Sequence, residues 1–259
     1  MQIKTTKTLA KLTIAGIALL STHITYASEK PTTNFKIGLD IKNHLEEYKE
    51  NSGDDTAALD IFFEFKANRF NLNRKSIYYN FIENKTIKIG LLGESNGTGF
   101  EEDDRKIFKG MEERDSSFDL GVRMAFTILD NSELIVSATS DIADSHEGDI
   151  YKIRYQHTIN SGRWELKPEI GFTHYSDEFI DYYYGVRKNE ATANRAFYKG
   201  QSEAIGHIGL AIRYQINPRL QLHGDLNLET ISTRIENSPL VTQDESINPN
   251  VFIGLTYQF

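Results

Sequence analysis

Hydrophobic and polar residues alternate along most of the chain beyond about residue 30. Near its end, every second position is apolar, at Val251, Ile253, Leu255, Tyr257 and Phe259. The intervening positions are mostly small or polar. A period of two places successive side chains on opposite faces of a β-strand, whereas a helix repeats every 3.6 residues. The pattern therefore predicts an all-β fold whose strands have one apolar and one polar face.

Several segments carry this alternation strongly enough to be predicted as strands. They are 34–45, 57–67, 69–82, 85–94, 116–128, 132–141, 149–159, 163–175, 203–215, 219–231 and 249–259. Most are about ten residues or longer, the length that crosses a bilayer at a tilt. The eleven segments make an odd count, but barrels made by one bacterial chain usually have an even number of strands. We expect twelve, with 182–186 as a candidate for the missing strand; ten is the alternative, if two of the N-terminal segments form one strand.

The connections and the end of the chain favour a membrane barrel over a soluble sandwich, which shows the same alternation. Short turns at 130–131, 160–162 and 217–218 alternate with long polar stretches at 95–115, 188–202 and 232–247. Outer-membrane barrels alternate short turns and long loops in this way. The terminal Leu255, Tyr257 and Phe259 resemble the signal that the outer-membrane barrel assembly machinery recognises. We therefore expect one antiparallel transmembrane β-barrel.

The first 27 residues have the pattern of a Sec-type signal peptide. Lys4, Lys7 and Lys11 precede a short apolar stretch at 12–20, and a small residue, Ala27, stands before Ser28. A positive region, a short apolar core and a small residue at the cleavage point are typical of secretory signals. An amphipathic anchor helix is the alternative. We expect cleavage between Ala27 and Ser28, leaving 28–259 as one barrel domain in the outer membrane.

Composition excludes several classes of protein. The net charge is −8 and there is no cysteine, while the mean hydropathy is −0.46. A bundle of transmembrane helices, a disulfide scaffold and an iron–sulfur or cysteine-ligated zinc protein are excluded. Nucleic acid is not an expected partner, because its binding needs a basic face.

The histidines were the first candidates for chemistry. His157 and His174 share the parity of apolar residues and are expected to face lipid or the membrane interface, whereas His207 and His223 share the polar parity and face the lumen. A turn at Asn217–Pro218 would pair Arg213 with His223 and His207 with Glu229. A histidine–carboxylate pair can orient a base, but no serine follows this parity and no G-x-S-x-G occurs. A hydrogen-bonded lumen network is therefore expected, not an enzyme.

No metal ion or cofactor is expected. Two acidic clusters, Asp54–Asp55 and Glu101–Asp104, lie in predicted loops. They lack the ordered ligand spacing of a dedicated calcium site. Solvated loop charges, or charges that meet the divalent cations of the lipopolysaccharide layer, explain them.

The cluster Tyr182–Tyr184 has three interpretations. It can be part of an interfacial girdle, it can pack a loop over the barrel mouth, or it can bind a partner, since tyrosine is common at interface hot spots.

Pro168 lies inside a predicted strand. Because proline cannot donate a ladder hydrogen bond, we expect a local bulge there.

Three sequence elements, taken in order, resemble the MipA/OmpV family. The first is a loop that contains Asp181, Tyr182, Tyr183, Tyr184, Gly185 and Val186, followed by Arg187, Glu190, Ala191 and Tyr198. The second is the segment 236–241, which includes Ser238 and Pro239, and the third is the ending 254–259. The resemblance covers roughly 112–259. The family's proline-containing second strand is represented by Asp60–Glu64, which has no proline.

The resemblance implies an outer-membrane barrel without established enzyme activity. The family's name-giving member is a scaffold that bridges a membrane-bound lytic transglycosylase and a bifunctional penicillin-binding protein in peptidoglycan remodelling. Lipid, lipopolysaccharide and the barrel assembly machinery are the other partners implied. A narrow channel for small solutes is the alternative function. The inward charges have mixed sign and can either pair or line a pore; they are Arg123, Glu165, Lys167, Glu169, Arg213, Asp225 and Glu229. An enzyme of the outer leaflet is a third possibility, but it lacks a nucleophile.

Overall fold

The computed structural model describes residues 33–44, 48–49, 58–97, 99–230, 232–241 and 247–259. The chain divides into two units, 1–30 and 31–259, and every described residue belongs to the second. The predicted signal peptide, with its cleavage point at Ala27 and Ser28, lies outside the described residues.

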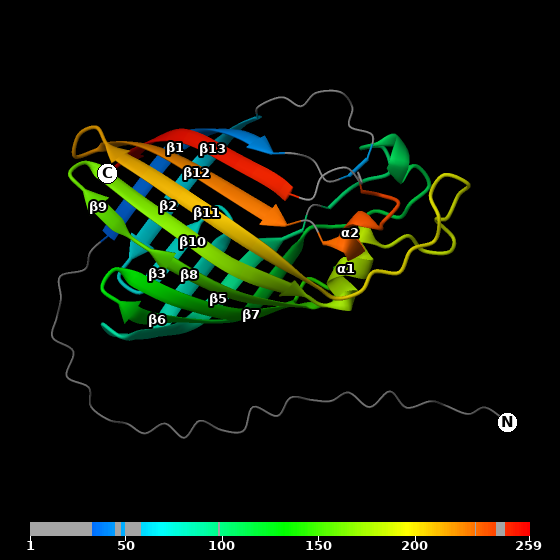
Figure 1. Ribbon diagram of the computed structural model, residues 1–259, viewed down its shortest axis with the longest axis horizontal. Helices are drawn as coiled ribbons and strands as arrows, with labels where there is room; N and C mark the ends of the chain where they lie inside the picture. The colour runs from blue at the N-terminus through cyan, green and yellow to red at the C-terminus, as the bar shows by residue number, and fades with distance from the viewer. Residues whose placement is uncertain (1–32, 45–47, 50–57, 98, 231, 242–246) are drawn as a thin grey trace, which may run out of the picture. The chain divides into compact units, whose positions relative to one another are not determined.

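The second unit is a closed antiparallel β-barrel (Figure 1). Its strands are β1 (Thr33–His44), β2 (Ala58–Ala67), β3 (Phe70–Asn73), β4 (Ser76–Glu83), β5 (Ile87–Asn96), β6 (Ser117–Leu129), β7 (Ser132–Asp141), β8 (Asp149–His157), β9 (Ile159–Ser161), β10 (Trp164–Tyr175), β11 (Glu203–Gln215), β12 (Leu220–Thr230) and β13 (Ile247–Gln258). Each strand pairs with its neighbours in the chain, except that β8 and β9 do not pair with each other, and pairing of β1 with β13 closes the barrel. β8 and β9 both pair with β10 in one continuous register, so they are two parts of one wall strand. The barrel therefore has the twelve strands that were expected.

The predicted segment 69–82 is two strands, β3 and β4, which are separated at Arg74–Lys75. This boundary supplies the strand that the sequence prediction lacked. There the chain turns between β3 and β4, and the Asn73 side chain accepts hydrogen bonds from the backbone N–H groups of Lys75 and Ser76, both at 3.0 Å. Such side-chain turns replace the glycine or proline that usually marks a hairpin. The prediction of a strand at 182–186 was wrong, because Tyr182–Tyr184 end the helix α1 (Asp177–Tyr184). The ten-strand alternative is also wrong.

The bulge predicted at Pro168 does not occur. β10 pairs with β11 without interruption from Trp164 to Tyr175. On the other side, β10 pairs with β9 up to Leu166 and resumes with β8 at Glu169. The missing N–H of proline is thus accommodated by a gap in one ladder. Bulges occur instead at the short-turn ends of β4 and β6, between Asn80 and Ile82 and between Thr127 and Leu129.

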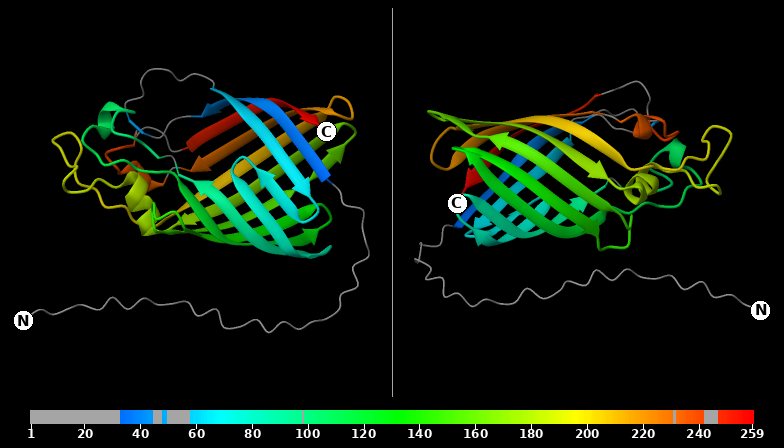
Figure 2. Two further views of the ribbon diagram at one scale, coloured as in Figure 1. Left: turned by 180° about the vertical axis from the view of Figure 1, so that it is seen from behind. Right: turned by 60° about the horizontal axis from the view of Figure 1, so that its bottom comes forward.

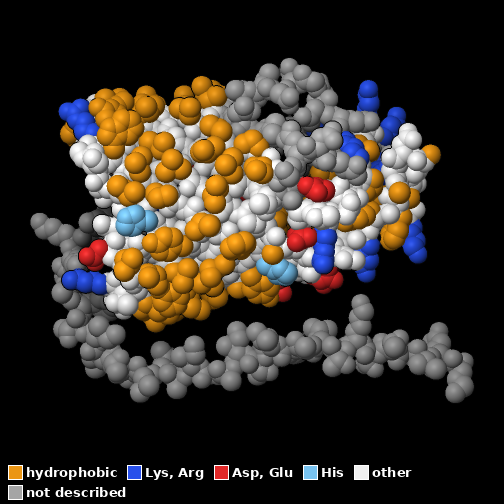
Figure 3. Space-filling model, in the orientation of Figure 1, with side chains coloured by type: hydrophobic (Ala, Val, Ile, Leu, Met, Phe, Trp, Pro, Cys, Tyr) orange, Lys and Arg blue, Asp and Glu red, His pale blue; other side chains and the backbone are white. Residues whose placement is uncertain are grey.

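Hydrophobic side chains cover much of the outer surface of the barrel on the face shown in Figure 3. These side chains come from alternate strand positions and are widely exposed, for example Leu59 at 70% and Ile253 at 57%. Aromatic residues gather near the short-turn end, where Trp164 packs against Tyr214 and Phe259 against Phe35, with ring centroids 4.6 and 5.6 Å apart. An apolar band edged by aromatic rings matches the hydrocarbon core and interface of a membrane.

The two ends of the barrel differ. The five strand connections at the end that holds the C-terminus are turns of two to four residues. The other end carries the long loops, with the 3-10 helix η1 (Lys106–Phe108), α1 and the short α2 (Thr233–Glu236) (Figure 2). In outer-membrane barrels, short turns face the periplasm and long loops face outward. Among the described residues, no helix has the length and apolar character to cross a membrane.

Candidate functional site

The long loops fold into a compact structure over the barrel mouth, here called the cap and defined as Tyr48, 99–116, 176–202 and 232–241. Most buried apolar side chains of the described residues belong to the cap. One cluster contains Tyr48, Phe100, Phe108, Met111, Val186 and Leu240, and a second contains Ile150, Phe179, Ile180, Tyr183, Ile235 and Val241. The hydrophobic core of this protein therefore lies at one end of the barrel and not within its lumen.

Stacked aromatic rings hold the first cluster together. Phe100 and Phe108 lie parallel with ring centroids 3.9 Å apart, and Tyr48 meets Phe108 edge-on at 5.1 Å. Aromatic pairs of this kind contribute about 0.5–1.5 kcal/mol beyond the burial of their surface. The Tyr48 hydroxyl also donates to the backbone carbonyl of Tyr183 at 3.1 Å, which joins the two clusters.

A buried ion pair lies at the centre of the cap. The Arg114 guanidinium donates to both carboxylate oxygens of Glu190, at 2.9 and 3.0 Å, and each side chain is 1% exposed. Arg114 Nε also donates to the carbonyl of Tyr182 at 2.9 Å. Glu190 accepts further hydrogen bonds from the N–H groups of Arg187 and Glu112, at 2.8 and 3.1 Å. The hydrogen-bonding atoms of both side chains are thus widely satisfied, as burial of a charged pair requires.

The electrostatics of Glu190 follow from these contacts. Burial by itself would raise its pKa, but the hydrogen bonds from Arg187 N–H and Arg114 outweigh burial, so the pKa lies below the ordinary 4.5. The carboxylate is therefore the stable form within the folded cap.

The tyrosine element of the sequence packs inside the cap. Tyr183 is 1% exposed, and its hydroxyl donates to the carbonyl of Asp115 at 2.9 Å. Burial raises the pKa of Tyr183 to about 12. Tyr182 is half-buried, and its hydroxyl accepts the N–H of Asp115 at 2.8 Å. Tyr184 contacts Tyr48, with ring centroids 5.8 Å apart. Of the three interpretations, loop packing over the mouth describes this geometry; a role in binding a partner stays a prediction.

The residues that follow complete the same element. Gly185 leaves no room for a side chain, because a Cβ there would lie 2.1 Å from the carbonyl oxygen of Asp181. The Asp181 carboxylate accepts the N–H of Gly200 at 2.7 Å, and Val186 pairs with Tyr198 in an isolated bridge. Each residue from 181 to 186 thus contributes a contact within the cap.

The second sequence element binds directly to the first. Ser238 is fully buried, and its hydroxyl donates to the carbonyl of Tyr184 at 2.7 Å while accepting the N–H of Leu240 at 3.2 Å. Pro239 is half-buried between these two residues. The two elements, more than fifty residues apart in the chain, therefore form one structural unit.

The strand positions proposed as an assembly signal also have a definite place. Leu255, Tyr257 and Phe259 project outward from β13 and the residue after it, with exposed fractions of 44, 37 and 72%. They face the membrane side, where another protein can reach them before the barrel is embedded. Recognition by the assembly machinery stays a prediction.

One cluster of possible metal ligands was missed by sequence reasoning. Asp119, Asp141 and His146 each have a ligand atom within 4.8 Å of the others. Their atoms are engaged by the chain itself: His146 Nδ1 accepts the N–H of Gly148 at 2.9 Å, and Nε2 faces Asp119 at 3.1 Å. The Asp141 carboxylate accepts N–H groups from three residues of the following loop, Ala143, Ser145 and Glu147. The cluster therefore explains how the loop after β7 folds.

The acidic loop predicted to be solvated is accessible. Glu101 to Asp104 are all exposed, and the Asp104 carboxylate accepts the N–H of Glu101 at 2.7 Å. Asp54 and Asp55 lie outside the described residues.

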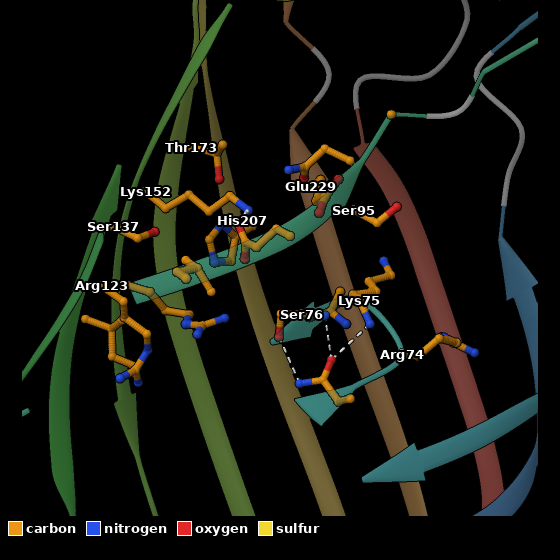
Figure 4. A pocket seen from close by; sticks show the side chains of 18 of the residues that line it. Arg74, Lys75, Ser76, Ser95, Arg123, Ser137, Lys152, Thr173, His207 and Glu229 are labelled. Atoms are coloured by element: carbon orange, nitrogen blue, oxygen red, sulfur yellow. Dashed lines mark hydrogen bonds and ion pairs between the residues drawn. The ribbon is translucent and has the colours of Figure 1, made fainter. Parts of the chain in front are cut away.

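The lumen forms a cavity of about 1680 Å³ beneath the cap. Figure 4 shows Arg123, Lys152 and His207 from three strands projecting into it. Many inward charges are paired across or along the wall, including Lys88–Glu133 and Lys152–Glu94 at 2.7 Å and Arg213–Glu165 at 2.6 Å. The predicted mixed sign of the lumen charges is thus resolved into ion pairs at several positions.

The predicted register of the hairpin β11–β12 is confirmed. Arg213 pairs with His223, and His207 pairs with Glu229. His223 Nε2 lies 2.8 Å from Asp40, and the hydroxyl of Thr256 lies 3.5 Å from its Nδ1. That hydroxyl donates to the carbonyl of Gln221 at 3.2 Å. Its proton is therefore engaged by that carbonyl, and His223, Asp40, Thr256 and Gln221 are joined in one hydrogen-bond network.

The predicted orientation of the other two histidines also agrees with the structure. His174 is exposed on the outer face of β10, near Tyr151. His157 lies on the outer parity of β8 and contacts the Ser132 hydroxyl at 2.6 Å.

Residues 43–259 match the protein family described as MltA-interacting protein MipA. The chain belongs to this family. The match covers every strand of the barrel from β2 onward and the whole of the cap. The resemblance seen in three short sequence elements therefore extends over the barrel as a whole.

Curated relatives of this MipA-family chain are outer-membrane proteins. The chain is 26% identical over 181 residues to the outer membrane protein Omp26La of Vibrio anguillarum, covering 69% of this chain and 70% of that protein. It is equally similar to the outer membrane protein OmpV of Vibrio cholerae, with the same identity and coverage. It is 24% identical over 127 residues to the MltA-interacting protein of Escherichia coli, covering 49% of this chain and 50% of that protein.

Solved structures with a similar outline are porins and channels. The NanC porin has a TM-score of 0.40 at 7% identity, covering 87% of this chain and 99% of the porin. The KdgM porin has a TM-score of 0.39 at 8% identity, with coverages of 88 and 99%. The family match and the named relatives, together with the closed barrel, identify the protein as an outer-membrane β-barrel of the MipA family.

Proposed function

We propose that this MipA-family barrel is a scaffold that holds cell-wall enzymes at the outer membrane. The observation that carries the proposal is the packed cap. The buried Arg114–Glu190 pair and two apolar clusters occupy the long-loop end of the barrel, so that end is built as a folded structure and not as an open vestibule. A barrel with a packed mouth is better suited to anchoring than to free diffusion of solutes.

The short-turn end is the face on which we place the partners. Enzymes that cut and extend peptidoglycan work in the periplasm, which this end faces. Four of its five turns carry a cation, Arg69, Lys85, Arg163 and Arg219, and the last three side chains are exposed. Charge complementarity favours a partner with an acidic surface. The expected partners are a lytic transglycosylase and a penicillin-binding protein.

Site-specific photo-crosslinking tests this assignment. A photoreactive amino acid placed at Lys85, Arg163 or Arg219 in intact cells should yield adducts that contain one of these enzymes. The matched control is Lys188, which is equally exposed but lies in the cap at the opposite end. Adducts with cell-wall enzymes from Lys188 alone, or from none of the four positions, would contradict the proposal.

A narrow channel is the second candidate, and the lumen cavity favours it. The cavity extends from Lys66 and Asn68 near the short turns to Phe108 and Phe179 beneath the cap. The scaffold proposal expects no conductance steps when the folded protein is placed in a planar bilayer. Regular steps would favour the channel, with Arg123 and Lys167 as lumen charges whose replacement should change ion selectivity.

A further inference from the structure

The barrel wall is incomplete along the outer half of β2. β1 pairs with β2 from Ala58 to Ala67, whereas β3 pairs with it only from Glu64 to Ala67. The β3–β4 hairpin turns at Arg74–Lys75, so it ends about halfway along β2, as the left view of Figure 2 shows. Within the described residues, Leu59–Phe63 therefore have no strand partner on the side away from β1.

An unpaired strand edge inside a membrane is unfavourable, because lipid offers no hydrogen bonds to the exposed N–H groups. Here a side chain compensates for the missing strand. Asp60 Oδ1 accepts the N–H of Ile61 at 2.8 Å, and Oδ2 binds the guanidinium of Arg74 at the tip of the hairpin. The Asp60–Arg74 pair, called the latch below, thus spans the gap between β2 and the hairpin.

The latch differs in its setting from the ion pairs that join adjacent strands. Lys36–Glu64 and Arg213–Glu165 each join two residues that are already opposite one another in an intact ladder. No strand pairing supports the latch within the described residues. Breaking it would leave the outer half of β2 held by β1 alone.

The lumen cavity lies directly behind the latch. Arg74, Lys75 and Ser76 line it at the hairpin tip (Figure 4), and the Arg74 guanidinium lies 5.5 Å from the ring centre of Phe252 on β13. The cap gives the cavity an apolar roof that includes Phe100, Phe108 and Phe179. The hairpin side of the latch therefore borders a lumen cavity that has polar walls and an apolar roof.

The outer side of the gap faces lipid. Leu59 and Ile61 project outward from β2 with exposed fractions of 70 and 59%, among the highest of the large apolar side chains. A lipid chain that packs against these two residues stands beside the latch.

We infer that the wall opens between Leu59–Phe63 and the Arg74–Lys75 turn, and that it admits the acyl chain of a membrane amphiphile with an anionic headgroup. The headgroup replaces Asp60 as the partner of Arg74, and the chain reaches the apolar roof. The anionic charge follows from the latch, because opening it leaves a guanidinium beside the entrance. This inference goes beyond a scaffold role, since it requires no protein partner.

Lipid quenching of a single tryptophan tests the entry. The chain has one tryptophan, Trp164, and a Trp164→Phe background allows one to be placed at Phe62, an inward residue of the unpaired edge that contacts His223. The control position is Ile135 on β7, which lines the lumen cavity away from the latch and is 5% exposed. In vesicles that contain brominated phosphatidylglycerol, Phe62→Trp should be quenched several-fold more strongly than Ile135→Trp, and more than by brominated phosphatidylcholine.

Opening the latch tests its role. Arg74→Gln in the Phe62→Trp background should increase quenching by brominated phosphatidylcholine and abolish the preference for the anionic lipid. Asp60→Asn should increase quenching but keep that preference. The control Arg213→Gln removes an ion pair from an intact ladder and should change neither. A heat-shift gel, which compares the mobility of each variant in SDS before and after boiling, verifies that the variant is a folded barrel.

Equal quenching at positions 62 and 135 with both lipids would overturn the inference, whatever the variants do. If quenching differs between positions 62 and 135 but Arg74→Gln and Asp60→Asn leave this difference unchanged, the role of the latch in lipid entry is contradicted. Neither result depends on whether cell-wall enzymes are recovered by crosslinking, so failure here is distinct from failure of the scaffold.

Discussion

Arg114 and Glu190 stand 76 positions apart in the chain and meet in the cap, where one guanidinium nitrogen, Nη2, donates to both carboxylate oxygens at 2.9 and 3.0 Å. Arg114 belongs to the loop before β6, and Glu190 to the loop after α1. Their pairing ties the loop that carries Phe100 and Phe108 to the loop that carries the tyrosine element. The stability of the cap should therefore depend on this contact more than on any exposed ion pair.

Removal of one partner should unfold the cap and leave the barrel intact. Glu190→Ala leaves a buried guanidinium without its carboxylate, a change that typically costs about 3–5 kcal/mol. Limited proteolysis should then cut within 99–116 and 176–202, while the heat-shift gel still shows a folded barrel. Arg187→Ala is the control, because its ion pair with Glu112 is exposed. Equal protease resistance of the Glu190 and Arg187 variants would contradict this prediction.

The cap should loosen in acid. The pKa of Glu190 is lower in the folded protein than its ordinary value of 4.5. The charged carboxylate therefore contributes its full stability above pH 4.5, and this contribution is lost as the pH falls through the lowered pKa. Digestion by an acid-active protease should accelerate over that range. In Glu190→Gln the rate of digestion should be high at every pH and should not increase further in acid. If the increase in acid were unchanged in this variant, another group would be responsible for it.

Tyr183 should resist ionisation. Because burial raises its pKa to about 12, the folded cap keeps the hydroxyl neutral above the ordinary value of 10.0. The contribution to stability is complete below pH 10.0 and is lost as the pH rises toward about 12. Tyrosine absorbance during an alkaline titration should show a group that titrates near pH 12 and that Tyr183→Phe removes. Tyr182→Phe, which changes a half-buried neighbour, should leave that group in place.

Gly185 should not tolerate alanine. A Cβ at this position would overlap the carbonyl oxygen of Asp181, 2.1 Å away, and backbone cannot move aside as a side-chain tip does. Gly185→Ala should raise the protease sensitivity of the cap. Gly224→Ala is the matched control, because its Cβ would meet only ordinary contacts, the nearest at 3.5 Å. Similar sensitivity of both variants would show that the packing around Gly185 is looser than described.

The sequence predicted the barrel wall well, because the wall obeys local rules. Alternation identified the inner and outer faces, and the tight turn at Asn217–Pro218 gave the correct register for Arg213 and His223. A short turn leaves only one pairing that keeps apolar side chains on the lipid face. The break between β3 and β4 was missed because Asn73 makes its turn without glycine or proline.

The cap could not be predicted in this way. Tyr182–Tyr184 have residue types that favour strands, yet they form the last turn of α1, which begins after Ser176 and buries Phe179 and Tyr183. Tertiary packing overrides local preference there. The Arg114–Glu190 pair and the latch each join residues from different elements, and no local pattern marks such contacts.

The distribution of the apolar core has a consequence for folding order. The cap is assembled from Tyr48 and from segments near residues 100, 180 and 240, which the chain brings together only through the closed ring of strands. Contacts of such long sequence separation form slowly, since the entropy of loop closure must be overcome first. The cap should therefore fold last, after β1 has paired with β13. It folds on the outer side of the membrane, opposite the periplasm from which the chain inserts. Withdrawal of the barrel from the membrane would then first require the two apolar clusters to be unpacked.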